Sequence, residues 1–150
     1  EVIQSKTYEL TNTIRTKPVR SSVNFDWDNL LLSGYYKDRE FALPLNRDVI
    51  DRAVLQMAII LDNQQGKHSS EYYVLDKDKI KKVQVSKKKL INIRVPFGQF
   101  EAIEIDHSSK ESDSINSLWL APELDYIPIK LTQKKDGKIV FSASLSQLTH

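Results

Sequence analysis

The spacing of apolar residues is the strongest constraint on the fold. Ten extended segments, most of them with alternating apolar and polar residues, are spread along the 150 residues, and this alternation is typical of strands with one buried face. They lie at residues 19–27, 30–36, 41–45, 71–75, 80–85, 90–95, 100–105, 116–120, 128–134 and 139–145. We therefore expect a mostly β protein.

One segment has the spacing of an amphipathic helix. Over residues 47–63, apolar residues recur three and four positions apart. Asn46 is suited to cap this helix, Asp48 would lie in its first turn, and Gly66 follows its end. The expected apolar stripe is Ile50, Ala53, Val54, Met57, Ala58 and Leu61. Further apolar residues lie beside the stripe, so we expect the helix to be covered on more than one side.

Turn signals separate most of the expected strands. Asp136-Gly137 is typical of a hairpin, Asp28-Asn29 and Lys37-Asp38 are plausible turns, and residues 96–99 form a Pro-Phe-Gly-Gln connection. Residues 87–89, three lysines, look like another hairpin end. Eight or more short strands cannot all lie flat. We predict a curved antiparallel sheet, a half-barrel or open barrel, with one long helix on its concave face, in a single β-rich domain over residues 1–150.

Composition narrows the possible chemistry. The chain has no cysteine, which excludes disulfides and thiolate sites. Its 22 basic and 20 acidic residues give a net charge of +2, too small to require a nucleic-acid partner. No apolar run approaches the length of a membrane-spanning helix, so we expect no transmembrane segment in this chain.

Catalytic and metal-binding motifs are missing from the sequence. His68, His107 and His150 lack the spacing of metal ligands, and we expect them to be solvated loop residues. No serine has the Gly-x-Ser-x-Gly context, and the four glycines form no phosphate-binding loop. We expect neither a metal site nor a cofactor.

Two pairs of acidic residues are the remaining catalytic candidates. Asp26 and Asp28, like Glu123 and Asp125, are separated by one residue, so a strand would point each pair to one side. Such pairs can perform hydrolysis. The alternative is that they form turns and bond to neighbouring backbone. We favour the turns and expect a protein that is not an enzyme.

Residues 77–89 carry the strongest local charge. A cluster of lysines can attract an anionic partner, such as a lipid headgroup or an acidic glycan. Lysines also protect a solvated sheet edge against aggregation, and we favour that reading. Tyr72 and Tyr73 precede the cluster instead of lying within it, which disfavours nucleic acid. The candidate anionic-partner patch is Lys79, Lys81, Lys82, Lys87, Lys88 and Lys89.

The most distinctive run is Ser117-Leu118-Trp119-Leu120-Ala121-Pro122-Glu123-Leu124-Asp125-Tyr126-Ile127-Pro128. Together with Asn24-Phe25-Asp26-Trp27, the leucine-rich helix and residues 95–100, it resembles the bacterial envelope family called domain of unknown function 3108, from about residue 19 onward. The resemblance implies an exported protein, periplasmic or outer-membrane-associated, and carries no established activity or binding residues. It also implies that further strands precede Glu1, so that the chain is the C-terminal part of a larger exported domain.

Three hypotheses about function follow. The first is a non-enzymatic envelope domain that binds a lipid, a glycolipid or another amphipathic ligand in the concave face of the sheet. Its candidate ligand-facing residues are Ile50, Val54, Met57, Leu61 and Trp119. The second is a protein-interaction or scaffold module of the envelope that pairs with a partner through a strand edge. The third is a hydrolase that uses the paired acids.

Overall fold

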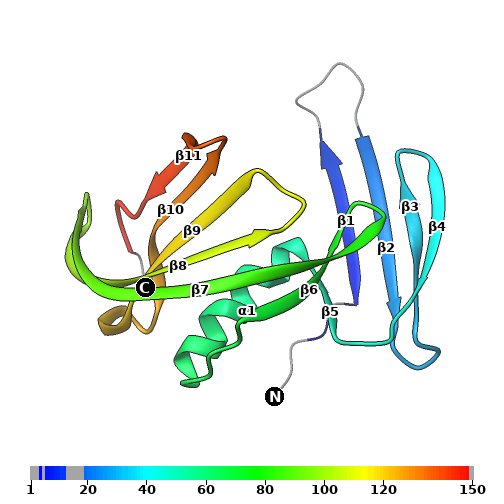
Figure 1. The fold of residues 1–150 in the computed structure, drawn as a ribbon, viewed down its shortest axis with the longest axis horizontal. Coiled ribbons are helices and arrows are strands. Elements are labelled where there is room, and N and C mark those ends of the chain that lie inside the picture. Colours follow the sequence, from blue (N-terminus) through cyan, green and yellow to red (C-terminus); the bar gives the residue numbers. More distant parts are fainter. Residues whose placement is uncertain (1–3, 5, 13–18, 149–150) are drawn as a thin grey trace. The chain divides into compact units, whose positions relative to one another are not determined.

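The structure, a computed structural model, describes residues 4, 6–12 and 19–148 (Figure 1). The chain divides into two compact units. The first comprises Glu1–Gln56 and Tyr73–Lys81, and the second comprises Met57–Tyr72 and Lys82–His150.

Strands make up most of the described chain, as predicted. They are β1 Thr7–Asn12, β2 Val19–Asp26, β3 Leu31–Tyr36, β4 Arg39–Pro44, β5 Val49–Asp51, β6 Glu71–Asp76, β7 Lys79–Val95, β8 Gly98–Ser109, β9 Ser114–Ala121, β10 Ile127–Lys135 and β11 Lys138–Ser144. One α-helix, α1 (Arg52–Gln64), and one 3-10 turn, η1 (Pro122–Leu124), complete the described elements. The predicted mostly β class with a single helix is confirmed.

The first unit contains a four-stranded antiparallel sheet in the order β1-β2-β3-β4. Strands β2 and β3 pair as an antiparallel hairpin, which confirms the predicted pairing. The predicted alternation is also present, since Val23 and Phe25 are buried and Asn24 is exposed. The core cluster of this unit comprises Val23, Phe25, Leu32, Leu45, Val49 and Leu75. The β3–β4 turn has positive φ at Lys37 (50°) and Asp38 (62°), the conformation that matches the twist of a two-residue hairpin.

The helix begins later than predicted. Residues 49–51 form β5, which pairs in parallel with β6, and neither Asn46 nor Asp48 belongs to the helix. Asp51 is the cap, since its Oδ1 accepts the backbone N–H groups of Ala53 (2.8 Å) and Val54 (3.0 Å). Ile50, expected on the helical stripe, is therefore a buried strand residue.

The buried face of α1 also differs from the predicted stripe. Leu55, Ile59 and Asn63 are buried at four-residue spacing, whereas Met57 is 55% exposed. The prediction placed Ile50 at the start of the helix and therefore chose the wrong face. The prediction that Gly66 follows the end of the helix is confirmed. Gly66 has φ +67°, its N–H donates to the Asn63 carbonyl (3.1 Å), and the Lys67 N–H donates to the Asp62 carbonyl (2.7 Å), so these carbonyls at the helix end have hydrogen-bond partners.

A second prediction fails in β7. Residues 80–85 and 90–95 were expected to be two strands joined at residues 87–89, but β7 is one strand of 17 residues. The lysines lie at a bulge, where the pairing with β8 shifts between Lys87 and Leu90. The extra residue bends the strand without ending it.

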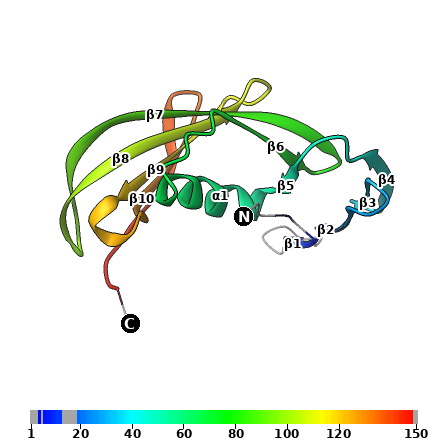
Figure 2. The same ribbon diagram turned by 90° about the horizontal axis from the view of Figure 1, so that it is seen from below.

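Strands β5 to β11 are hydrogen-bonded in the order β11-β10-β9-β8-β7-β6-β5. All described pairs in this sheet are antiparallel except β5 with β6. In the second unit, β7 and β8 curve around the C-terminal half of α1 (Figure 2). The predicted curved sheet, in half-barrel form with a helix on its concave side, is confirmed.

The C-terminal part of strand β9, Ser117–Ala121, is buried on both faces. Trp119 and Ala121 belong to a core cluster with Val95, Ala102 and Ile129. Leu118 and Leu120 alternate with them and pair with Ile105 and Ile103 of β8. The distinctive Ser117–Ala121 run thus lacks a solvent-facing polar side because none of its residues is more than 9% exposed.

Candidate functional site

A cleft of about 190 Å³ lies within the second unit. It is bounded by the C-terminal half of α1, the segment that leads into β6, and strands β7 and β8. Its lining residues are Ile59, Asp62, Asn63, Lys67, His68, Ser69, Ser70, Tyr72, Val85, Lys87 and Ile105. The backbone N–H of Val85 donates to the Ser70 carbonyl (2.8 Å) and holds the segment against β7.

Asp62 is the polar centre of the cleft. Its Oδ2 accepts hydrogen bonds from the Tyr72 hydroxyl at 2.6 Å and from the Ser69 hydroxyl. Burial, and then the hydrogen bond to Asp62, raise the pKa of Tyr72 far above its ordinary value. Tyr72 is therefore protonated and serves as a donor at any physiological pH.

The floor of the cleft is apolar. Ile59 and Ile105 are each 1% exposed, and Val85 is half-buried. Beside them, the Nδ2 of Asn63 donates to the Ile59 carbonyl (2.8 Å), which fixes the orientation of the amide. The buried Oδ1 of Asn63 has no hydrogen-bond partner among the described residues, an unusual state for a buried acceptor.

Basic residues lie at the rim. Lys67, His68 and Lys87 are exposed, and none of them forms an ion pair with a described residue. Lys88, the next residue, differs. Its Nζ lies 2.7 Å from Glu104 Oε1 and 2.8 Å from Asp106 Oδ2.

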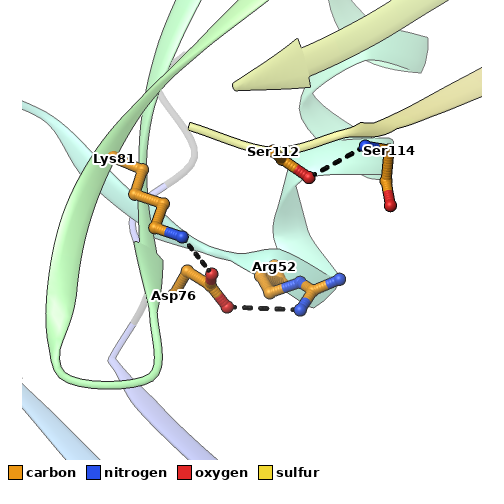
Figure 3. A network of polar contacts seen from close by, with 5 residues as sticks. All are labelled: Arg52, Asp76, Lys81, Ser112 and Ser114. Atoms are coloured by element: carbon orange, nitrogen blue, oxygen red, sulfur yellow. Dashed lines mark hydrogen bonds and ion pairs between the residues drawn. The ribbon is translucent and has the colours of Figure 1, made fainter. Parts of the chain in front are cut away.

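Some lysines of the predicted patch form ion pairs and others do not. Lys82 contacts Glu71 at 2.5 Å, and in the first unit Asp76 lies between Lys81 (2.9 Å) and Arg52 (3.2 Å) (Figure 3). With Lys88, three of the six predicted lysines therefore face carboxylates. The other three, Lys79, Lys87 and Lys89, are exposed, and Lys87 alone of the six lines the cleft.

The predicted ligand-facing residues lie elsewhere. Ile50 is buried in β5, while Val54 and Leu61 are partly buried and Met57 is exposed on α1. Trp119 is 9% exposed and packs in the core, with the Lys130 Nζ 4.9 Å from its ring centroid. None of the five lines the cleft.

The paired acids lie at turns. Asp26 accepts the Asn29 backbone N–H at 3.0 Å and the Asn29 side-chain amide at 2.8 Å, which confirms the turn interpretation for this residue. The side-chain hydrogen bond from Asn29 is the larger cause that lowers the pKa of Asp26. Asp28 follows in the β2–β3 turn, Glu123 belongs to η1, and Asp125 ends it with φ 54°.

The histidines do not share one environment. His68 is exposed at the cleft, whereas His107 is 7% exposed within β8, so the prediction of a solvated loop residue is wrong for His107. His150 lies outside the described residues. Over residues 4, 6–12 and 19–148, no group of three or more potential ligands is placed to hold a metal ion.

A second, more open hollow of about 510 Å³ lies in the first unit against β3 and β4. Its lining residues are Ser33, Gly34, Tyr35, Glu40, Phe41 and Ala42. It has one charged residue and no hydrogen-bonded polar group at its centre, so the cleft of the second unit is the better candidate site.

Sequence reasoning missed the cleft almost completely. The available signal was the polar run Lys67-His68-Ser69-Ser70 between the helix and the next strand. Short polar connections are common, and only the folded structure shows that this one faces Asp62.

Within the described part of the chain, no helix is both long and apolar enough to cross a membrane. The family model described as "Protein of unknown function (DUF3108)" matches residues 3–143. Neither a curated protein nor a solved structure matches the chain.

Proposed function

The chain belongs to the DUF3108 family, and we propose that it is a non-enzymatic domain that binds a lipid or another amphipathic ligand in the cleft beneath its curved sheet. The proposal extends to location: the protein acts in the bacterial cell envelope, on the periplasmic side or at the outer membrane.

The observation that carries this proposal is the mixed lining of the cleft. Half-buried Val85, backed by the fully buried Ile59 and Ile105, offers apolar surface, and Asp62 with its two hydroxyl donors also lines the cleft. Pockets that bind small molecules combine an apolar wall with a few placed polar groups in this way. The volume of about 190 Å³ corresponds to about six water molecules. It accommodates a head group and a few carbons, while the rest of a lipid would lie outside.

Binding suits the polar groups better than catalysis does. A nucleophilic serine donates its hydroxyl to a general base that can take the proton. Ser69 donates to Asp62, which also holds the Tyr72 hydroxyl. The Oδ2 of Asp62 is thus shared between two hydroxyl donors instead of being reserved for Ser69, and Tyr72, whose pKa is raised, keeps its proton.

The test is the recovery of ligand from protein purified from its own host, followed by native mass spectrometry. Ser70→Trp places a large side chain at the cleft, whereas Ser86→Trp places the same bulk at an exposed position of β7 outside it. We expect an amphipathic ligand with the wild type and with Ser86→Trp, and none with Ser70→Trp. Repeated recovery of no ligand, or equal recovery from both variants, would contradict the proposal.

The location has its own test. Fractionation of host cells that express the complete protein is expected to place it with periplasmic or outer-membrane markers. A purely cytosolic distribution would refute this part of the proposal.

A protein-interaction module is the second candidate because of strand β11. Among the described pairings β11 bonds only to β10, and Ile139, Val140 and Phe141 are 60, 58 and 53% exposed. Exposed apolar residues on an edge strand are typical of a partner site. A photo-crosslinker at Val140 in intact cells discriminates: a reproducible adduct with one protein favours this function, and lipid adducts alone disfavour it.

A further inference from the structure

Resting on the cleft as the ligand site, we infer that the polar end of its ligand is an anion, a carboxylate or phosphate attached to an apolar chain, which is bound by Lys67 and Lys87.

The net charge of the residues that line the cleft favours the binding of an anionic ligand. The two lysines contribute +2 and Asp62 contributes −1, a net charge of +1 with His68 neutral. The charge of Asp62 is already stabilised by hydrogen bonds from Ser69 and Tyr72. The lysines have no comparable partner among the described residues, so their ammonium groups are the ones left for a ligand.

Three neighbouring lysines of β7 are paired with carboxylates, whereas Lys79 and Lys89, like Lys87, are exposed and form no ion pair with a described residue but lie outside the cleft. Lys81, Lys82 and Lys88 of the same strand each lie within 2.9 Å of a carboxylate oxygen. Lys87 lines the cleft and forms no ion pair with a described residue. It comes from β7 and Lys67 from the segment after α1, so elements far apart in sequence contribute cations to one cleft.

The floor indicates what the anion is attached to. Val85, half-buried beside the fully buried Ile59 and Ile105, offers no hydrogen bond from its side chain, so a free phosphate would leave its apolar surface uncovered. A short alkyl chain beside the anionic group covers it and removes apolar surface from water. The complementary ligand is therefore an anionic amphiphile rather than an inorganic ion.

Calorimetry with four probes below their micellar concentrations tests this inference. Octyl phosphate is the expected ligand, octyl glucoside supplies the same chain without charge, octyltrimethylammonium reverses the charge, and inorganic phosphate lacks the chain. We expect octyl phosphate to bind most tightly of the four, and we expect its affinity to fall as the salt concentration rises.

Variants assign the charge to the two lysines. Lys67→Gln and Lys87→Gln are each expected to weaken octyl phosphate binding about fivefold, the upper range for a solvent-exposed charge pair. Lys89→Gln, at an exposed position outside the cleft, is the matched control and should bind as the wild type does. All three side chains are exposed, so the variants are expected to fold, which circular dichroism checks.

The outcomes separate this inference from the proposed function. If octyl glucoside binds as tightly as octyl phosphate and the lysine variants bind octyl phosphate as the wild type does, the inference of an anionic ligand is refuted, while the proposal that the cleft binds an amphiphile is retained. If inorganic phosphate binds as tightly as octyl phosphate, the inference that the ligand carries an apolar chain is refuted. If no octyl compound binds, or if Ser70→Trp binds them all equally well, the inference and the proposed function both fail.

Discussion

Replacing Gly34 by alanine tests how closely β2 and β3 approach each other. An added Cβ would lie 2.1 Å from the backbone oxygen of Ser22 and 2.9 Å from the Cα of Val23. Real Cβ contacts essentially never fall below 3.0 Å, so the β2 backbone would have to move by about 0.9 Å, the difference between 3.0 and 2.1 Å.

That movement is opposed from several directions. Strand β2 is hydrogen-bonded to β1 on one side and to β3 on the other, and Val23 and Phe25 anchor it in the core of the first unit. Overpacking typically costs about 1–3 kcal/mol, and a clash with backbone belongs at the upper end. We expect Gly34→Ala to lower the free energy of unfolding by about 3 kcal/mol.

Gly137→Ala is the matched control. It makes the same chemical change in the β10–β11 turn, where nothing lies within 4 Å of the added Cβ and the cost comes only from φ of +75°. A left-handed backbone costs an L-residue about 1–2 kcal/mol. The two substitutions therefore separate a steric clash from backbone strain.

Urea unfolding followed by tryptophan fluorescence measures both effects, because each unit holds one tryptophan. Trp27 packs against the core of the first unit and Trp119 belongs to a core cluster of the second. With Trp119→Phe as background and a slope of about 1.5 kcal/mol per M, Gly34→Ala should lower the Trp27 midpoint by about 2 M. A change of less than about 0.5 kcal/mol would refute the reasoning, since it would show that the two strands can separate freely.

Three further sites are probed by substitution. Asp51→Ala removes the acceptor of two helix N–H groups and should destabilise the protein by about 1–2 kcal/mol in thermal circular dichroism, and Asp51→Ser by less. Burial alone would raise the pKa of Asp76, but its hydrogen bond with Lys81 and the charge of Arg52 hold that pKa below its usual range. The resulting stabilisation is present above about pH 4 and is lost as pH falls through the folded pKa, so Asp76→Asn should flatten the decline in unfolding free energy below about pH 4. Leu118→Ala should cost about 2–5 kcal/mol in urea unfolding, because the side chain is fully buried, whereas the same change at exposed Ile115 should cost less than about 0.5 kcal/mol.

The hairpins were predictable because their signals are local. Alternation along β2 and β3 fixes which side chains turn inward, and Asp136-Gly137 has the positive φ angles, 50° and 75°, that its residue types tolerate. Each of these choices depends on residues within a few positions of one another.

The start of the helix and the length of β7 were not predictable in that way. Residues 49–51 fit a helical stripe, but pairing with β6, more than twenty residues later, makes them a strand. The lysines at residues 87–89 resemble a turn, but pairing with β8 carries β7 through a bulge. Contacts distant in sequence decided both cases.

The cleft depends on distant contacts even more strongly. Only Lys87 of its lining residues was among the predicted site residues. The helical face that supplies Ile59, Asp62 and Asn63 is not the face that the apolar pattern favoured. Its chemistry comes from a helix, a connecting segment and two strands, which no local pattern joins.

The burial of Ser117–Ala121 of β9 on both faces has a consequence for how the second unit exchanges its amide hydrogens with solvent. Backbone groups of β9 are bonded to β8 on one side and β10 on the other, and apolar side chains cover it above and below. Such a strand opens only when its neighbours have opened. Deuterium should therefore enter β11 first and the centre of β9 last, so that Leu118 to Leu120 report the global stability of this unit.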